Sequence, residues 1–189
     1  MSTNKINAEL LAKMFLAGAK NLEVKKEWIN ELNVFPVPDG DTGTNMTMTI
    51  MAAAREVAAI ENPTMESIAK ALSSGSLRGA RGNSGVITSQ IFRGIYQGVE
   101  GLDVVNGAQL ARALVTGSRV AYRAVMRPVE GTILTVVREA ADYTYAYAMD
   151  QEDVSCEAVM AKMLEESKAS LERTPELLPV LPARAMGWP

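Results

Sequence analysis

The sequence predicts an all-α fold, a bundle or closed ring of antiparallel helices. Along most of the 189 residues, apolar side chains recur at the three- and four-residue spacing of amphipathic helices. Short segments rich in glycine and proline separate these runs. No segment combines two-residue alternation with β-branched residues and hairpin turn pairs, so no strand is predicted. Helices of this length with short connections pack as antiparallel neighbours.

The first half of the chain contains four predicted helical runs. The first is an apolar stripe that bends near Asn21. The second is rich in methionine and alanine, which favour helix. Pro63 opens the third, because proline is tolerated in the first helical turn. The runs cover residues 7–32, 45–60, 63–72 and 86–99. A glycine-rich stretch over 73–85 separates the last two runs.

The second half contains the clearest helical stripe of the sequence. Small residues lie on that stripe, which predicts close contact with a neighbouring helix. Pro128 and Gly131 break the periodicity before the next run. The last sixteen residues hold four prolines and are predicted to run extended along the surface. The helical runs cover 110–125, 133–149 and 153–173, and the extended stretch covers 174–189.

Composition excludes several classes of protein. A chain of this length with 48% hydrophobic residues forms one globular domain with a substantial core. The formal charge of −3 offers no footprint for a polyanion, so nucleic-acid binding is not expected. No apolar run reaches the ~18 residues of a membrane span, and the first residues do not resemble a secretion signal. We therefore expect a cytoplasmic protein without a membrane span.

The chemistry open to the chain is narrow because it contains no histidine and one cysteine. Ser-His-Asp and Cys-His nucleophile systems, imidazole metal sites and thiolate metal cages are excluded. Cys156 is expected to be a small buried hydrophobe. Any catalysis must use carboxylates, hydroxyls, amides, arginines and bound ions.

The sharpest local feature is the segment Pro38-Asp-Gly-Asp-Thr-Gly-Thr-Asn45. Asp39 and Asp41 are separated by one glycine in a loop stiffened by proline, so both carboxylates can face one hard cation. Magnesium needs only one or two carboxylates and takes its other ligands from water and phosphate. A helix follows, with Thr44 or Asn45 at its cap, and its free amides favour an anion. The alternative is that both aspartates serve only as Asx turns and a helix cap.

Two further loops each lead into a helix. Glycines at 75, 79, 82 and 85 let the backbone approach a ligand, and Arg78 and Arg81 offer charge to phosphate. The alternative for this stretch is a glycine-rich crossing of two helices. In the third loop, Gly131 and Thr132 start a helix. The three loops together suggest a triphosphate site, because such a ligand needs several converging donors.

Three motifs together resemble the nucleotide-binding domain of the dihydroxyacetone kinase L-subunit (DhaL-like) family. Within it the chain is most similar to the N-terminal ATP-binding domain of bacterial fatty acid kinase. The resemblance implies a closed antiparallel barrel or bundle of about eight helices, with ATP or ADP and Mg²⁺ held by loops at one end. The resemblance runs from about residue 7 to 181 and implies a domain over residues 1–181, with 182–189 as an atypical tail. The motifs are Leu32–Met46, Arg78–Val86 and Arg127–Thr135.

The resemblance also implies roles for individual residues. Asp39 and Asp41 match the metal-binding and catalytic carboxylates, and Asn33 is the nearest candidate for a third metal ligand. The phosphate-contacting positions correspond to Thr42, Gly43, Thr44, Asn45, Gly82, Asn83 and Ser84. The adenine-binding positions correspond to Gly131, Thr132 and Leu134.

The function implied is ATP-dependent phosphoryl transfer to a fatty acid carboxylate presented by a separate fatty-acid-binding protein, giving an acyl phosphate. A carboxylate acceptor is already ionised near neutral pH, so the lack of a histidine base is tolerable. One alternative is an L-type subunit of dihydroxyacetone kinase, whose acceptor is also held on another subunit. A second alternative is an ATP-binding regulatory module that transfers no phosphate. A homodimer is compatible with each of these.

Overall fold

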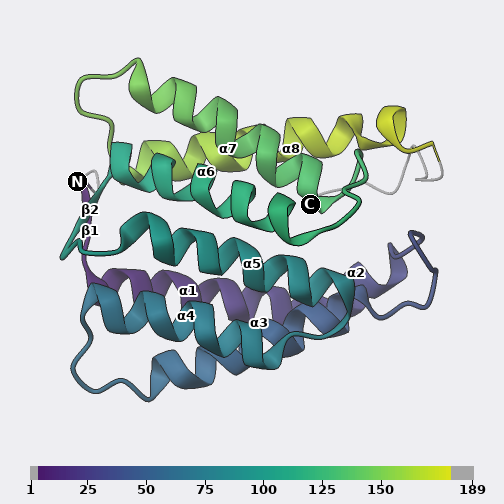
Figure 1. Ribbon diagram of the computed structural model, residues 1–189, viewed down its shortest axis with the longest axis horizontal. Helices are drawn as coiled ribbons and strands as arrows, with labels where there is room; N and C mark the ends of the chain where they lie inside the picture. The colour runs from purple at the N-terminus through teal and green to yellow at the C-terminus, as the bar shows by residue number, and fades with distance from the viewer. Residues whose placement is uncertain (1–3, 180–189) are drawn as a thin grey trace.

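The computed structural model describes residues 4–179 and confirms the all-α prediction. Eight helices and one pair of very short strands make up the described part of the chain (Figure 1). In chain order the elements are β1 (Lys5–Ile6), α1 (Ala8–Val24), α2 (Lys26–Glu31), α3 (Thr42–Ala58), α4 (Met65–Gly79), α5 (Gly82–Val99), β2 (Val105–Asn106), α6 (Gly107–Ala124), α7 (Ile133–Met149) and α8 (Cys156–Leu177).

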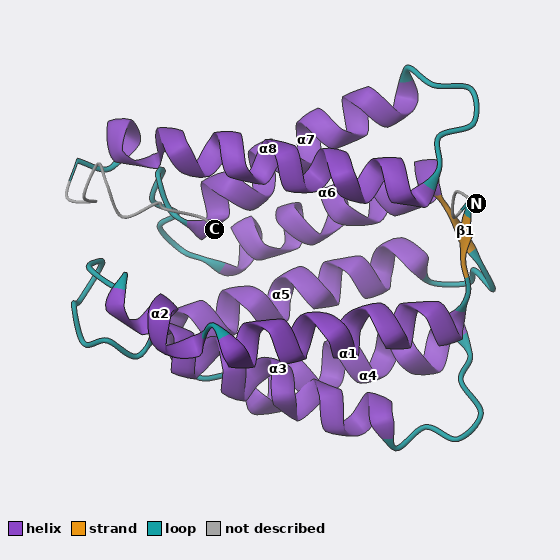
Figure 2. Ribbon diagram, turned by 180° about the vertical axis from the view of Figure 1, so that it is seen from behind, coloured by secondary structure: helices purple, strands orange, loops and turns teal. Residues whose placement is uncertain are grey.

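The helices form two groups that meet along one seam. Helices α1 to α5 make one half of the bundle and α6 to α8 the other, with α5 against α6 between them (Figures 1 and 2). At this seam a Cβ added to Gly94 would lie 2.6 Å from the Cα of Gly117, and one added to Gly98 would lie 2.6 Å from the Cα of Ala113. The small residues of the α6 stripe therefore allow the close helix contact that the sequence predicts.

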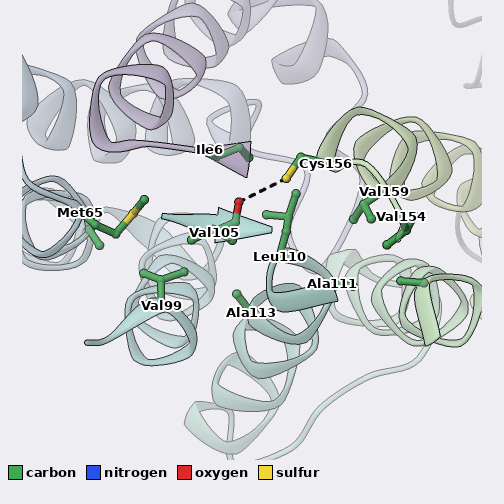
Figure 3. Close-up of a cluster of buried hydrophobic side chains, with 12 residues drawn as sticks. Ile6, Met65, Val99, Val105, Leu110, Ala111, Ala113, Val154, Cys156 and Val159 are labelled. Atoms are coloured by element: carbon green, nitrogen blue, oxygen red, sulfur yellow. Dashed lines mark hydrogen bonds between the residues drawn. The ribbon is translucent and has the colours of Figure 1, made fainter. Parts of the chain in front are cut away.

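The prediction that the chain has no strand is wrong at one place. Strand β1 pairs antiparallel with β2, and Ile6 faces Val105 in that pairing. Two-residue strands are too short to show alternation in a sequence, so only the fold reveals them. Cys156 closes this end of the core, since its thiol donates to the Val105 carbonyl over 3.4 Å (Figure 3). Burial raises the pKa of this thiol, which fits its predicted role as a buried hydrophobe.

The predicted interruption over 73–85 is also wrong for most of its length. Helix α4 continues to Gly79 and α5 begins at Gly82. The glycines instead permit close packing on α3: a Cβ added to Gly75 would lie 2.7 Å from the Cα of Ala53. The alternative of a glycine-rich helix crossing is therefore correct for this part of the stretch. In the first run, the break lies between α1 and α2 at Lys25 rather than near Asn21.

Helix α8 extends further than the proline-rich sequence predicts. It continues to Leu177 with Pro175 inside it, so the expected extended path is wrong over 174–177. Proline cannot donate to the carbonyl of Leu171, and the hydroxyl of Thr174 donates to it instead over 2.7 Å. The predicted tail over 182–189 lies outside the described residues. Within 4–179, no helix is long and apolar enough to cross a membrane.

Candidate functional site

The three loops that the sequence singles out lie at one end of the bundle. The loops between α2 and α3, α4 and α5, and α6 and α7 all open toward the end where α8 finishes (Figures 1 and 2). This placement follows from the antiparallel order of the helices, because every second connection returns to the same end. The candidate site is therefore built from segments far apart in the sequence.

The first loop presents two carboxylates to solvent. The amide nitrogen of Asn33 donates to Asp39 over 2.7 Å, which places this predicted third ligand in direct contact with the first. Both aspartates are exposed. Helix α3 begins at Thr42, so the predicted cap at Thr44 or Asn45 is wrong by about one turn. Asp41 occupies the cap position, but its side chain makes no capping hydrogen bond. Its oxygens are therefore not used by the helix, as the alternative of a helix cap would require.

This donor set fits magnesium better than a metal that needs a protein cage. Within residues 4–179, no group of three or more histidine, cysteine, aspartate or glutamate side chains could hold a metal ion. Two carboxylates and one amide oxygen leave most of the coordination shell to water and a ligand, as magnesium prefers.

The start of α3 is held in place by a residue that the sequence analysis missed. The Asn30 side chain accepts from the amide of Thr44 over 3.0 Å and donates to the Thr44 hydroxyl over 3.0 Å. A Cβ added to Gly43 would lie 2.1 Å from the carbonyl oxygen of Lys26, so only glycine fits here. Thr44 is thus engaged by the fold, whereas the amides of Thr42 and Gly43 remain at the open helix end.

The second loop brings the start of α5 against the start of α3. A Cβ added to Gly82 would lie 2.5 Å from the side-chain nitrogen of Asn45. Thr49 completes this junction, because its hydroxyl donates to the Asn45 carbonyl over 2.7 Å and accepts from the Arg81 amide over 3.2 Å. No side chain caps α5, and Asn83 is exposed while Ser84 is half-buried. Two helix N-termini with free amides therefore lie side by side.

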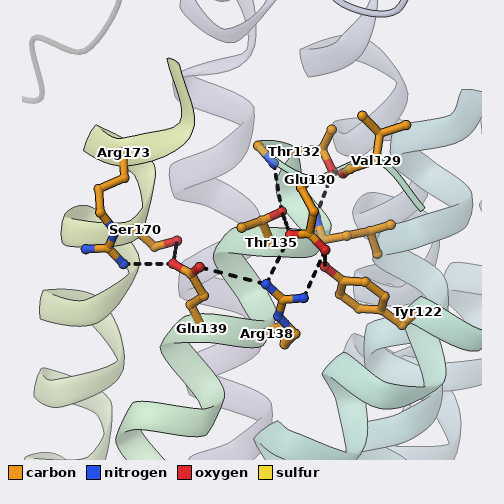
Figure 4. Close-up of polar contacts among 11 residues, drawn as sticks. Tyr122, Val129, Glu130, Thr132, Thr135, Arg138, Glu139, Ser170 and Arg173 are labelled. Atoms are coloured by element: carbon orange, nitrogen blue, oxygen red, sulfur yellow. Dashed lines mark hydrogen bonds and ion pairs between the residues drawn. The ribbon is translucent and has the colours of Figure 1, made fainter. Parts of the chain in front are cut away.

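The third loop is organised by Glu130 (Figure 4). Its carboxylate accepts from the Tyr122 hydroxyl over 3.1 Å, from the Thr135 hydroxyl over 2.7 Å, and from both terminal nitrogens of Arg138 over 2.9 and 3.0 Å. The Thr135 bond, with those from Arg138 and Tyr122, holds the pKa of Glu130 below its usual value despite partial burial. We call Tyr122, Glu130, Thr135 and Arg138 the Glu130 network.

The Glu130 network fixes the predicted adenine-binding residues. The amide of Gly131 donates to the Thr135 hydroxyl over 2.8 Å, and Gly131 adopts a φ of +79°. The prediction that Gly131 and Thr132 start a helix is close: α7 begins at Ile133, and Thr132 is its cap. Leu134 is only 2% exposed and lies in the core, so it presents little surface to a ligand.

A second layer of contacts ties this loop to α8. The Glu139 carboxylate accepts from the Ser170 hydroxyl over 2.8 Å and from Arg173 over 2.7 Å (Figure 4). These donors lower the pKa of Glu139, against the opposing effect of its burial. Sequence reasoning missed the Glu139 contacts because Ser170 and Arg173 lie more than thirty residues away on another helix. The contacts of Glu130 with Thr135 and Arg138 lie only five and eight residues apart, so the polar residues after the Glu-Gly pair were a local signal that could have indicated them.

Comparison with known proteins gives consistent matches. The family model described as the DAK2 domain matches residues 36–186. Protein YloV of Bacillus subtilis is 49% identical over 181 residues, which cover 96% of this chain and 32% of that protein. Uncharacterized proteins of Staphylococcus saprophyticus and Staphylococcus epidermidis are 49% and 46% identical over 94% of this chain. The chain spans about a third of the length of these curated relatives.

Proposed function

The chain belongs to the DAK2 domain family of kinase-related domains, and from this premise we propose that it binds ATP with Mg²⁺ and supports phosphoryl transfer. Membership confirms the resemblance to the DhaL-like family that the motifs indicate. We further propose that the acceptor is a fatty acid carboxylate presented by a separate fatty-acid-binding protein in the cytoplasm.

The observation that carries this proposal is the meeting of Asp41, Asn45 and Gly82 at one end of the bundle. Two helix N-termini lie together there, and amides at such ends favour phosphate. The exposed carboxylates of Asp39 and Asp41 stand beside the first of them. Anion-binding amides next to carboxylates for a cation are the pairing that a magnesium-bound triphosphate needs.

Different residues of the chain would bind the metal, the phosphates and the adenine. Asp39 and Asp41, with Asn33, would hold magnesium, which when bound neutralises charge on the phosphates. The amides of Thr42 and Gly43, together with Asn45, Asn83 and Ser84, would orient the phosphate oxygens. Gly131 and Thr132 would contact the adenine end. Phosphoryl transfer depends mainly on positioning and charge stabilisation, so a chain without histidine can support it.

Calorimetric titration tests the nucleotide site directly. We expect ATP to bind with Mg²⁺ and to bind at least about tenfold more weakly to Asp41→Ala, because a carboxylate ligand of the metal is lost. Asp103→Ala is the matched control, since Asp103 is an exposed aspartate in the connection from α5 to β2. Strand β2 lies at the opposite end of the bundle (Figure 1). Equal magnesium-dependent affinity in the two variants would show that the metal assignment is wrong.

The acceptor requires a separate experiment because the chain covers only part of its relatives. ATP and Mg²⁺ would be mixed with a lipid-loaded fatty-acid-binding protein and the remaining domains of a full-length relative. Formation of acyl phosphate supports the fatty acid kinase, whereas phosphorylation of dihydroxyacetone held on its own subunit supports the other branch. Nucleotide binding without transfer to either acceptor supports the regulatory module.

A further inference from the structure

A surface groove is lined by residues of α3, of α4 and of the connection from α4 to α5. Helices α3 and α4 lie at the edge of the bundle opposite α7 and α8 (Figure 1). The volume of the groove is about 440 Å³. Small residues on both helices line it, so no bulky side chain fills the space between the charged residues. The lining residues are Ala52, Arg55, Glu56, Ala59, Gly75, Arg78, Gly79 and Arg81.

The groove is positively charged in a chain whose net charge is −3. Arg78 pairs with Glu56, the one acidic residue of the lining. Arg55 makes no ion pair within the described part of the chain. Among residues 4–179, the guanidinium of Arg81 donates only to the neighbouring carbonyl of Ala80, over 3.2 Å. Two guanidinium groups are therefore left without an acidic partner in this part of the chain.

Helix stability does not account for Arg81. Arg55 and Arg78 lie in the last turns of α3 and α4, where a cation interacts favourably with the helix dipole. Arg81 instead occupies the cap position at the start of α5, where the dipole disfavours a positive charge. A residue that breaks a local rule in this way is expected where a ligand compensates for it.

Exposed apolar side chains lie on the same helices and on the adjoining α5. Met48, Leu77 and Val86 are 49%, 50% and 43% exposed. The backbone carbonyl of Met48 lies 3.5 Å from a Cβ added to Gly79, so the backbone of Met48 lies next to this lining residue of the groove. Arginine and methionine are enriched where proteins contact one another.

We infer that this groove is a docking surface for an acidic segment of a partner protein. It extends along α3 from Ala52 to Ala59, a distance of roughly 10 Å at 1.5 Å per residue. This length suits several carboxylates on one helix or extended segment better than a single small anion. Charge complementarity would then steer the partner to this face.

The groove leads toward the candidate nucleotide site. Arg55 lies roughly 20 Å along α3 from the start of that helix, whereas Arg81 directly precedes Gly82. A partner seated in the groove would lie beside the phosphate end. The identification of this partner as the protein that carries the phosphate acceptor rests on the proposed function. The inference that the partner is acidic rests on the groove alone.

The test uses a fluorescent peptide rich in glutamate with interspersed leucine, carrying one photoreactive side chain. We expect cross-links on α3 and α4, and a Kd about fivefold or more weaker for Arg55→Glu and for Arg81→Gln. Arg112→Glu, at an exposed arginine of α6, is the control and should stay within about twofold of the native chain. A peptide with glutamine in place of glutamate should not bind.

Three results would overturn the inference: cross-links on other helices, equal weakening by Arg55→Glu and Arg112→Glu, or displacement of the peptide by inorganic phosphate at matched ionic strength. The last would identify a small anion as the occupant. Titration of ATP with Mg²⁺ on Arg55→Glu separates the two proposals, because the groove variant should keep native nucleotide affinity. If the native chain binds ATP but not the peptide, the docking surface is wrong and the nucleotide site stands. If it binds the peptide but not ATP, the nucleotide site is wrong and the docking surface stands.

Discussion

The first and third loops of the candidate site use carboxylates in opposite ways. In each, an acidic residue precedes a glycine with positive φ: Asp39 before Gly40 and Glu130 before Gly131. Asp39 is exposed and accepts one side-chain hydrogen bond, from Asn33. Glu130 accepts from a tyrosine, a threonine and an arginine. The partners, not the residue type, therefore decide whether a carboxylate is available to a ligand or belongs to the framework.

Substitution of the glycine that follows each carboxylate should show the largest difference in stability between the two loops. Gly131→Ala introduces a Cβ 2.6 Å from that of Leu178 as well as an unfavourable φ, so we expect a loss of about 2–4 kcal/mol in the free energy of unfolding. Gly40→Ala meets nothing closer than 3.9 Å and carries only the φ cost, about 1 kcal/mol. Urea denaturation measures both. Equal losses would mean that packing on α8 does not hold the third loop.

The next effect concerns the carboxylates themselves. Glu130→Gln removes the charge from the Glu130 network, and we expect a loss of about 1 kcal/mol, modest because the side chain is partly exposed. Asp41→Asn should change the free energy of unfolding by less than about 0.5 kcal/mol, since Asp41 makes no capping bond. Thermal denaturation at matched pH compares them. A larger loss for Asp41→Asn would assign that aspartate to the framework.

The smallest effect is a pH dependence. The pKa values of Glu130 and Glu139 are lowered in the folded chain, so the stability they contribute is present above the unfolded pKa and is lost as pH falls through the folded values. Stability should therefore fall more steeply in native protein than in Glu130→Gln on acidification below about pH 4.3. Urea midpoints at several pH values measure the difference. Parallel curves would exclude this contribution from Glu130.

Much of the fold could be predicted from local pattern. The run 133–149 coincides with α7, and the stripe of α6 correctly predicts a close helix contact. The errors occur where a distant partner decides: β1 pairs with β2 across the chain, and Gly75 packs into α3 instead of ending a helix. Pro175 remains helical because Thr174 takes the carbonyl that proline leaves unbonded.

The candidate site divides in the same way. The pattern of the sequence indicates Asp39, Asp41 and the glycine-containing loops as a candidate site, because turn residues and helix starts have local sequence signals. The contacts of Asn30 with Thr44 and of Glu139 with Arg173 could not be predicted in this way, since packing brings these partners together from distant parts of the chain.

The amino-acid order by itself determined an all-helical chain with chemically suggestive loops, because helix periodicity and turn preference act over a few residues. The tertiary structure alone decided that α3 and α5 start side by side, that Glu139 of α7 binds two side chains of α8, and that three arginines share one groove. Those outcomes depend on which helices pack together, and that choice is made by the whole core at once.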